Sequence, residues 1–407
     1  MTGNWSALTP RGRGFLTAGL AAAICGIVLG ERDLVAIGLV LGLLPVLAGM
    51  WLFTSDVEID VTRSVSRHQV ETGHPVDVEL RITGSGSRAR RALLRESVPY
   101  ALGSSPRFTV DALSGRPVVA SYSVRTEMRG RHAVGPTTVT TTDPFGFLAR
   151  HRKLTDTTRI VVTPRPDPLS GAPVTLGDGH SAGEFHPRSF IGGDATDVTI
   201  RDYRRGDDLR RVHWPSTAHA GELMVRREER PRQTACTLLV DNRLSAHRGS
   251  GSRSSLEYAI RATASIALHL IAHGCRIHAY DATGLPLLDE GHEEQPGTAA
   301  EAILTALALL PAADQQHLGD DWARHSDGSF VIAVLGALDD HDRSLLGRVG
   351  RHAGDRLALA LDTGSWGEAS DPDPGSDPAG RLRPSGWRAV SLRSETRIAD
   401  AWQALGP

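Results

Sequence analysis

Lysine is almost absent from this sequence, since of 45 basic residues only Lys153 is a lysine and the rest are arginines. A GC-rich genome that favours arginine codons is the interpretation we prefer, and arginine-specific recognition of phosphate or carboxylate is the alternative. The formal net charge of −2 gives no strong field that would attract nucleic acid. We therefore expect no nucleic-acid partner.

Cysteine is also scarce, because Cys25, Cys236 and Cys275 are the only three in 407 residues. Three cysteines cannot form a disulfide framework, and none has a C-x-x-C partner, which excludes a structural zinc of that type. Free thiols in a reducing compartment are expected.

Motifs of common catalytic sites are missing as well. No H-E-x-x-H zinc motif occurs, and Gly192-Gly193-Asp194 lacks the lysine of a phosphate-binding loop. Ser245 has no adjacent base in the sequence, so a hydrolase is only the third-ranked hypothesis. We expect no enzyme.

Two long uncharged runs stand near the N-terminus, at residues 15–30 and 34–53. The second has the length of a membrane span, and the first is accommodated by tilt or a thinned bilayer. A cleaved signal peptide is the alternative, but the second run follows almost at once. Arg11 and Arg13 precede the first run, so the positive-inside rule predicts a two-span membrane protein whose later domains are cytoplasmic. This region is assigned to residues 1–54.

Residues 55–165 show short alternating runs, such as residues 76–82, separated by Gly- and Ser-rich turns. Apolar residues at every second position predict strands with one buried face, and therefore a small antiparallel β-sandwich. A linker with a signature segment follows at residues 166–235.

Residues 236–407 alternate strands with helices, which predicts a mainly parallel sheet covered on both faces. Four predicted strands end at an aspartate. Because ligand sites form beyond the carboxyl ends of such strands, these aspartates mark the edge where a site is expected; they are Asp241, Asp281, Asp339 and Asp362.

The segment at residues 201–214 reads RDYRRGDDLRRVHW and resembles the signature of the domain of unknown function 58 family. The two uncharged runs and the residues 129–132 and 143–146 fit the same family. The resemblance names these signature residues: Glu184, Arg188, Arg201, Tyr203, Gly206, Asp207, Arg210, Trp214 and Arg226.

Physically, this segment interleaves arginines with acids, which favours a network of bidentate Arg–carboxylate pairs that holds it on the α/β domain, with Trp214 as a large buried surface. The alternative is a partner-docking surface, where arginine and tryptophan are enriched.

The resemblance implies a von Willebrand A-like (Rossmann-like) α/β fold for residues 236–407. It also implies a MoxR-type AAA+ ATPase as partner, often together with a membrane transglutaminase-like protein. These are expectations from the family alone.

Von Willebrand A domains often bind Mg²⁺ through D-x-S-x-S at the end of the first strand. The corresponding residues 241–245 are DNRLS, so Asp241 and Ser245 match while Arg243 replaces a ligand, and Asp339 is placed as a distal aspartate. We favour a metal-free Arg243–Asp241 pair, with no cofactor, over a degenerate Mg²⁺ site.

The leading hypothesis is a non-catalytic, membrane-anchored adaptor that presents its α/β domain to an AAA+ ATPase. The alternative is a divalent-metal-dependent protein- or ligand-binding module at Asp241 and Ser245.

Overall fold

The chain forms two compact units in a computed structural model. The structure describes residues 5–53, 58–85, 91–111, 117–171, 197–202, 212, 214–229, 235–288, 296–325, 330–349, 355–367 and 377–406. Unit 1 contains Met1–Pro166, Gly249–Ala264 and Glu301–Ala312, and unit 2 contains Asp167–Arg248, Ser265–Ala300 and Ala313–Pro407.

Unit 1 begins with a helical hairpin, α1 (Pro10–Leu29) and α2 (Arg32–Phe53). Both helices have the length and composition of membrane spans, with mean hydropathies of 1.7 and 2.3. Only 17% and 22% of these apolar windows are buried, unlike the core helix of a soluble protein.

The two helices pack through glycines. A Cβ at Gly19 would lie 2.8 Å from the carbonyl oxygen of Gly38, and one at Gly26 would lie 2.7 Å from the amide nitrogen of Val35. The close approach therefore requires small residues, as is common where two helices pack closely in membrane proteins.

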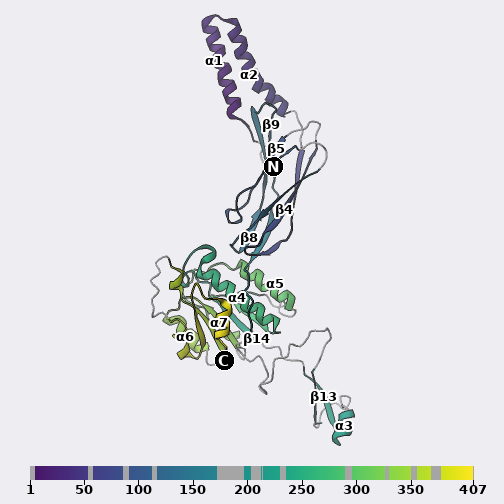
Figure 1. Ribbon diagram of the computed structural model, residues 1–407, viewed down its shortest axis with the longest axis vertical. Helices are drawn as coiled ribbons and strands as arrows, with labels where there is room; N and C mark the ends of the chain where they lie inside the picture. Colours follow the sequence, from purple (N-terminus) through teal and green to yellow (C-terminus); the bar gives the residue numbers. More distant parts are fainter. Residues whose placement is uncertain are drawn as a thin grey trace. The chain divides into compact units, whose positions relative to one another are not determined.

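The rest of unit 1 is β-rich, as predicted (Figure 1). One five-stranded sheet has the order β1-β10-β9-β5-β6, and two three-stranded sheets have the orders β2-β4-β7 and β3-β11-β8. Every pairing is antiparallel except that of β3 with β11. The strands are β1 (Trp5–Leu8), β2 (Glu58–Val65), β3 (Gln69–Glu71), β4 (Val76–Ser85), β5 (Arg91–Glu96), β6 (Arg107–Asp111), β7 (Val118–Val124), β8 (Gly130–Val134), β9 (Thr137–Thr142), β10 (Leu148–Lys153) and β11 (Thr158–Thr163).

The β region is built as predicted from alternation. In β4, Val76, Val78, Leu80 and Ile82 are all buried, and they pack with side chains of neighbouring strands in two apolar clusters. Apolar residues at every second position thus face one core layer.

Arg129, the first of the residues 129–132 that fit the family resemblance, has a structural role. Its guanidinium donates to the carbonyls of Leu307 at 2.9 Å and Leu310 at 2.7 Å, and it pairs with the Glu257 carboxylate. Leu307 lies in the last turn of α5 (Pro296–Leu309), so a cation here complements the helix dipole.

Unit 2 contains a five-stranded, fully parallel sheet of order β15-β14-β16-β17-β18. Its strands are β14 (Ala235–Val240), β15 (Arg276–Tyr280), β16 (Phe330–Leu335), β17 (Arg356–Leu361) and β18 (Arg388–Leu392). Along the chain they alternate with α4 (Ser255–Ala272), α5, α6 (Asp340–Val349) and α7 (Ile398–Ala404).

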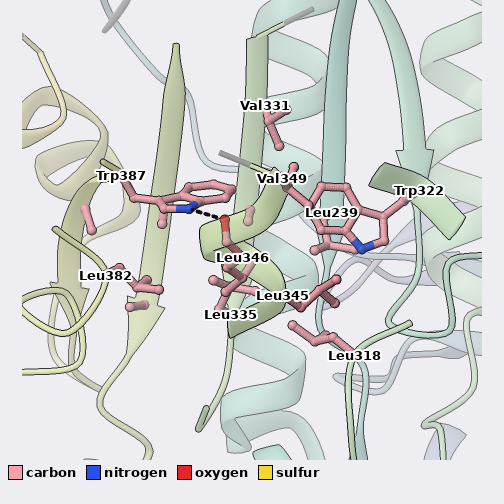
Figure 2. Close-up of a cluster of buried hydrophobic side chains, with 14 of the residues drawn as sticks. Leu239, Leu318, Trp322, Val331, Leu335, Leu345, Leu346, Val349, Leu382 and Trp387 are labelled. Atoms are coloured by element: carbon pink, nitrogen blue, oxygen red, sulfur yellow. Dashed lines mark hydrogen bonds between the residues drawn. The ribbon is translucent and has the colours of Figure 1, made fainter. Parts of the chain in front are cut away.

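Helix α6 packs on one face of this sheet (Figure 2). Leu345 and Leu346 lie in a cluster with Leu239 and Leu335 of the central strands, and the indole of Trp387 donates to the carbonyl of Leu346 at 3.1 Å. This packing fixes the position of the first turn of α6 at the edge of the sheet.

A two-stranded sheet precedes the parallel sheet in the chain. Strands β12 (Asp197–Asp202) and β13 (Met224–Glu229) form an antiparallel pair, and α3 (Trp214–Ala220) stands between them in the chain.

Candidate functional site

The candidate site lies where the strand order of the parallel sheet reverses. Strand β14 pairs with β15 on one side and with β16 on the other, so the connections leave it in opposite directions. In such sheets a crevice opens at the carboxyl ends of the two strands at the switch point. Here Asp241 directly follows β14, and Gly336 directly follows β16.

Arg243 fills this crevice. Its Nε donates to Oδ1 of Asp241 and its Nη2 to Oδ2, both at 2.8 Å, so the two planar groups meet fork to fork. The Arg243 side chain is 1% exposed and that of Asp241 is 0% exposed. The backbone N–H of Gly336 also donates to Oδ2 of Asp241, at 3.1 Å.

The other N–H groups of Arg243 are used as well. Nη1 donates to Oδ2 of Asp342 at 2.8 Å and to the Gln316 carbonyl at 2.7 Å, and Nη2 donates to the Ala337 carbonyl at 3.3 Å. An arginine carries five N–H donors. All five therefore have acceptors, and these come from the segments that follow β14 and β16 and from residues 316 and 342.

Asp342 is held in place by the start of α6. Oδ1 of Asp339 accepts from the N–H of Asp342 at 2.8 Å, and Oδ2 of Asp342 accepts from the N–H of Asp339 at 3.3 Å. This reciprocal pair is a capping box built from two aspartates. The N–H of Leu318 adds a bond to Oδ1 of Asp342 at 2.9 Å.

The charges of the crevice stabilise one another. Burial lowers the pKa of the Arg243 guanidinium, but hydrogen bonds and charges from Asp241 and Asp342 outweigh burial and raise the pKa above its usual value. Burial also lowers the pKa of His247, whose Nε2 donates to the Asp241 carbonyl at 2.7 Å. His247 is therefore a neutral donor at neutral pH.

The remaining strand-end aspartates also have partners. Oδ1 of Asp281 accepts from the N–H groups of Thr283 and Leu285 in its own turn, at 2.9 and 3.0 Å. Asp362 lies 3.3 Å from Nε of Arg393. In the parts of the chain that the structure describes, each strand-end carboxylate thus supports the local fold.

The residues proposed for a degenerate Mg²⁺ site have separate partners. The Asp241 oxygens are engaged by Arg243, the Ser245 hydroxyl donates to the Gln315 carbonyl at 3.4 Å, and Asp339 lies 2.8 Å from Nδ1 of His317. A hard cation needs oxygen ligands facing a common point. With Arg243 in place this donor set does not fit Mg²⁺.

A mixed cluster flanks the crevice. Ligand atoms of His317, Asp339 and Asp342 lie within 4.8 Å of one another, and the ring centroids of His317 and His341 are also 4.8 Å apart. The contact with His317 and the N–H of Asp342 hold the pKa of Asp339 below its usual value, the N–H contributing most. These groups are paired with one another and with the cap of α6.

Most of the signature residues lie outside the described residues, namely Glu184, Arg188, Tyr203, Gly206, Asp207 and Arg210. The backbones of Arg201 and Arg226 belong to the paired strands β12 and β13. Trp214 begins α3 and is 68% exposed, so the prediction that it supplies a large buried surface is wrong.

Sequence reasoning missed several residues of the crevice. Asp342 had a detectable signal, because Asp339 and Asp342 have the spacing of a capping box before an apolar helix. The carbonyls of Gln316 and Ala337 had none, since a backbone acceptor leaves no mark on residue type. His269 and His273, whose rings are 4.3 Å apart on and just beyond α4, were also missed.

Comparison with known families supports the resemblance. Residues 199–320 match the family described as "Protein of unknown function DUF58", which confirms the resemblance seen in the signature segment. No curated protein matches the sequence.

Similarities to solved structures are slight. The CARDB domain of the PF1109 protein from Pyrococcus furiosus is 12% identical, with 26% of this chain and 93% of that chain covered and a TM-score of 0.19. A beta-glucosidase from Listeria innocua is 13% identical, with 27% and 16% covered and a TM-score of 0.19. The alkylpurine DNA glycosylase AlkC from Pseudomonas fluorescens is 11% identical, with 37% and 45% covered and a TM-score of 0.19. Similarities of this size carry no argument about fold or function.

Proposed function

We propose that this protein, which matches the DUF58 family over residues 199–320, is a non-catalytic, membrane-anchored adaptor that presents an α/β domain to a protein partner. The observation that carries this proposal is the buried Arg243 at the switch point of the sheet. A catalytic or cation-binding crevice needs polar groups free to meet a ligand. Here those groups are already paired with one another.

Membrane anchorage is supported by the two apolar helices of unit 1. The N-terminal strand β1 pairs with β10, which follows both helices in the chain. A removable signal peptide would not be expected to supply a strand to the mature sheet. With Arg11 and Arg13 before the first span, we place the soluble domains in the cytoplasm.

The partner we propose is an AAA+ ATPase of the MoxR type, because the family resemblance implies it. The same resemblance implies a von Willebrand A-like fold for residues 236–407, and the parallel sheet with its strand-end crevice is compatible with that fold. A membrane transglutaminase-like protein is a further candidate for the same assembly.

The exposed Trp214 favours docking over a purely structural role for the signature segment. Trp214 is 68% exposed, and tryptophan is enriched at interface hot spots. We therefore place the docking surface around α3 and the strands β12 and β13.

The test is direct binding between the full-length protein, in detergent or nanodiscs, and the purified MoxR-type ATPase from the same organism, with and without ATP. Saturable binding that Trp214→Ala weakens supports the proposal. Failure to bind that ATPase in any nucleotide state contradicts the assignment of the partner.

The alternative is a divalent-metal-dependent binding module at Asp241 and Ser245. It requires Arg243 to leave both carboxylates, and its test is titration with Mg²⁺ and Mn²⁺. A hydrolase, the third hypothesis, is weakened by the Ser245 hydroxyl, which donates to a backbone carbonyl at 3.4 Å.

A further inference from the structure

The turn between β9 and β10 lies against the first turn of α1. The N–H of Thr9 donates to the Phe147 carbonyl at 2.8 Å, and the Thr9 hydroxyl donates to the Gly146 carbonyl at 2.6 Å. The same hydroxyl accepts from the N–H of Gly12 at 3.2 Å and so caps the helix. Gly12 itself touches the Phe147 carbonyl so closely that a Cβ there would overlap it.

A row of aromatic rings continues this contact outward. The ring centroids of Phe15 and Phe147 are 4.7 Å apart, and those of Phe147 and Phe145 are 5.7 Å apart and stacked. Phe147 is 5% exposed, whereas Phe145 is 60% exposed. Phe145, the outermost ring of the row, therefore stacks on Phe147 with one side and is itself largely exposed.

The sequence of α1 fixes the height of this row. Arg13 is the last charged residue before the uncharged run, and Phe15 is the first apolar ring of that run. An α-helix rises about 1.5 Å per residue, so these two residues differ in height by only about 3 Å. Each polar headgroup layer is roughly 5–7 Å thick, and the Phe15 ring thus lies close to its inner boundary.

We propose that the β9–β10 turn, residues 143–147, is a third membrane contact, in which the Phe145 ring enters the headgroup layer beside the first span. The occupant of this surface is lipid, because the turn is continuous with the spans. Exposed Arg11 and Arg13 face the same layer, where a cation meets phosphate. This inference rests on the proposed membrane anchorage.

The Asp143 carboxylate gives the turn a fixed shape. Oδ1 accepts from the N–H of Phe145 at 2.9 Å and Oδ2 from the N–H of Leu148 at 2.6 Å. Such Asx bonds replace backbone bonds in a turn. The ring of Phe145 is thus presented on a rigid support rather than on a loose loop.

The experiment uses the full-length protein in nanodiscs, with 4-fluorophenylalanine incorporated at position 145, 100 or 27. Fluorine relaxation is measured with a headgroup-proximal nitroxide lipid and, separately, with a water-soluble paramagnetic ion. Tyr100 is 99% exposed, and the β5–β9 register places it beyond the end of the sheet that is opposite the turn. Ile27 is 71% exposed and lies two residues before the end of α1, near the opposite boundary of the first span.

We expect the nitroxide lipid to accelerate relaxation at position 145 several-fold more than at position 100, with the reverse order for the aqueous ion. Equal behaviour of positions 145 and 100 overturns the inference. Protection of position 145 from both reagents also overturns it, because a protein partner or a second copy would then cover the ring. Position 27 separates the two proposals: if the lipid probe does not reach it, the membrane anchorage itself fails.

Discussion

The guanidinium of Arg243 and the carboxylate of Asp241 form two parallel hydrogen bonds of 2.8 Å, although only one residue separates them in the chain. Both residues follow the end of β14, and the Arg243 guanidinium also donates to the carboxylate of Asp342 at the start of α6. One side chain thus joins the loops that follow two central strands. A cation bound by the same carboxylates would join the same loops.

Arg243→Ala should destabilise the α/β domain strongly, because it leaves two buried carboxylates without their cation. Breaking a buried ion pair from one side costs about 3–5 kcal/mol. Chemical denaturation of the full-length protein in detergent measures this loss. The matched control is Arg324→Ala, since Arg324 forms an ion pair with Asp321 but is 72% exposed, and little change is expected there. Equal effects of the two substitutions would contradict the role given to Arg243.

Titration of Mg²⁺ or Mn²⁺ into the full-length protein should give no saturable heat. Arg243 already occupies the acceptors that a hard cation would use. Saturable binding that Asp241→Asn abolishes would instead establish the metal-dependent alternative. Arg243→Ser, which restores a small hydroxyl, is the variant most able to acquire binding.

Trp214→Ala should weaken binding of the ATPase by about 30-fold or more if Trp214 is a hot spot, since such residues contribute at least about 2 kcal/mol. Surface plasmon resonance with the full-length protein in nanodiscs measures the affinity. Tyr100→Ala removes another exposed aromatic ring and serves as the control. Unchanged affinity in Trp214→Ala would move the docking surface away from α3.

Stability should fall as the pH drops below about 6.5, partly because of His247. Burial lowers its pKa in the folded state from 6.5, so the unfolded chain binds more protons between the two pKa values. The contribution of neutral His247 to the free energy of unfolding is therefore complete above pH 6.5, and it is lost as the pH falls towards the lowered pKa. His247→Gln keeps a donor for the Asp241 carbonyl, and its stability should depend less on pH. Parallel curves for the two proteins would be inconsistent with this account.

Gly19→Leu should separate the two apolar helices. The new side chain would meet the backbone of Gly38 and Gly42 at about 2.8 Å. Gly42→Leu makes the same change in composition, yet a Cβ at Gly42 has nothing within 4 Å. Thermal stability in detergent should therefore fall for the first variant only. A similar loss for both variants would show that the helix packing differs from the one described.

Local patterns predicted most of the sheet in unit 2. Three of the aspartates predicted to end strands, Asp241, Asp281 and Asp362, directly follow β14, β15 and β17, because buried parallel strands are continuous apolar runs with clear ends. The Arg243–Asp241 pair was also predicted, since a guanidinium replaces a ligand beside the aspartate of a known motif.

Features that depend on distant contacts were not predicted. Gly38 was missed as a packing residue because any glycine on an apolar helix looks the same until the partner helix is known. The prediction of a buried Trp214 failed for a related reason. A large aromatic side chain indicates buried area, but it does not say whether that area is buried by this chain or by another.

The pairing of β1 with β10 has a consequence for how the protein is made. Thr9 bonds to Phe147, 138 residues later, so the N-terminal segment must wait while both apolar helices and the strands β2 to β9 leave the ribosome. Until then β10 is the outermost strand of its sheet, with unpaired backbone groups that favour aggregation. A nascent chain whose first residues are blocked or removed would keep that edge open after synthesis.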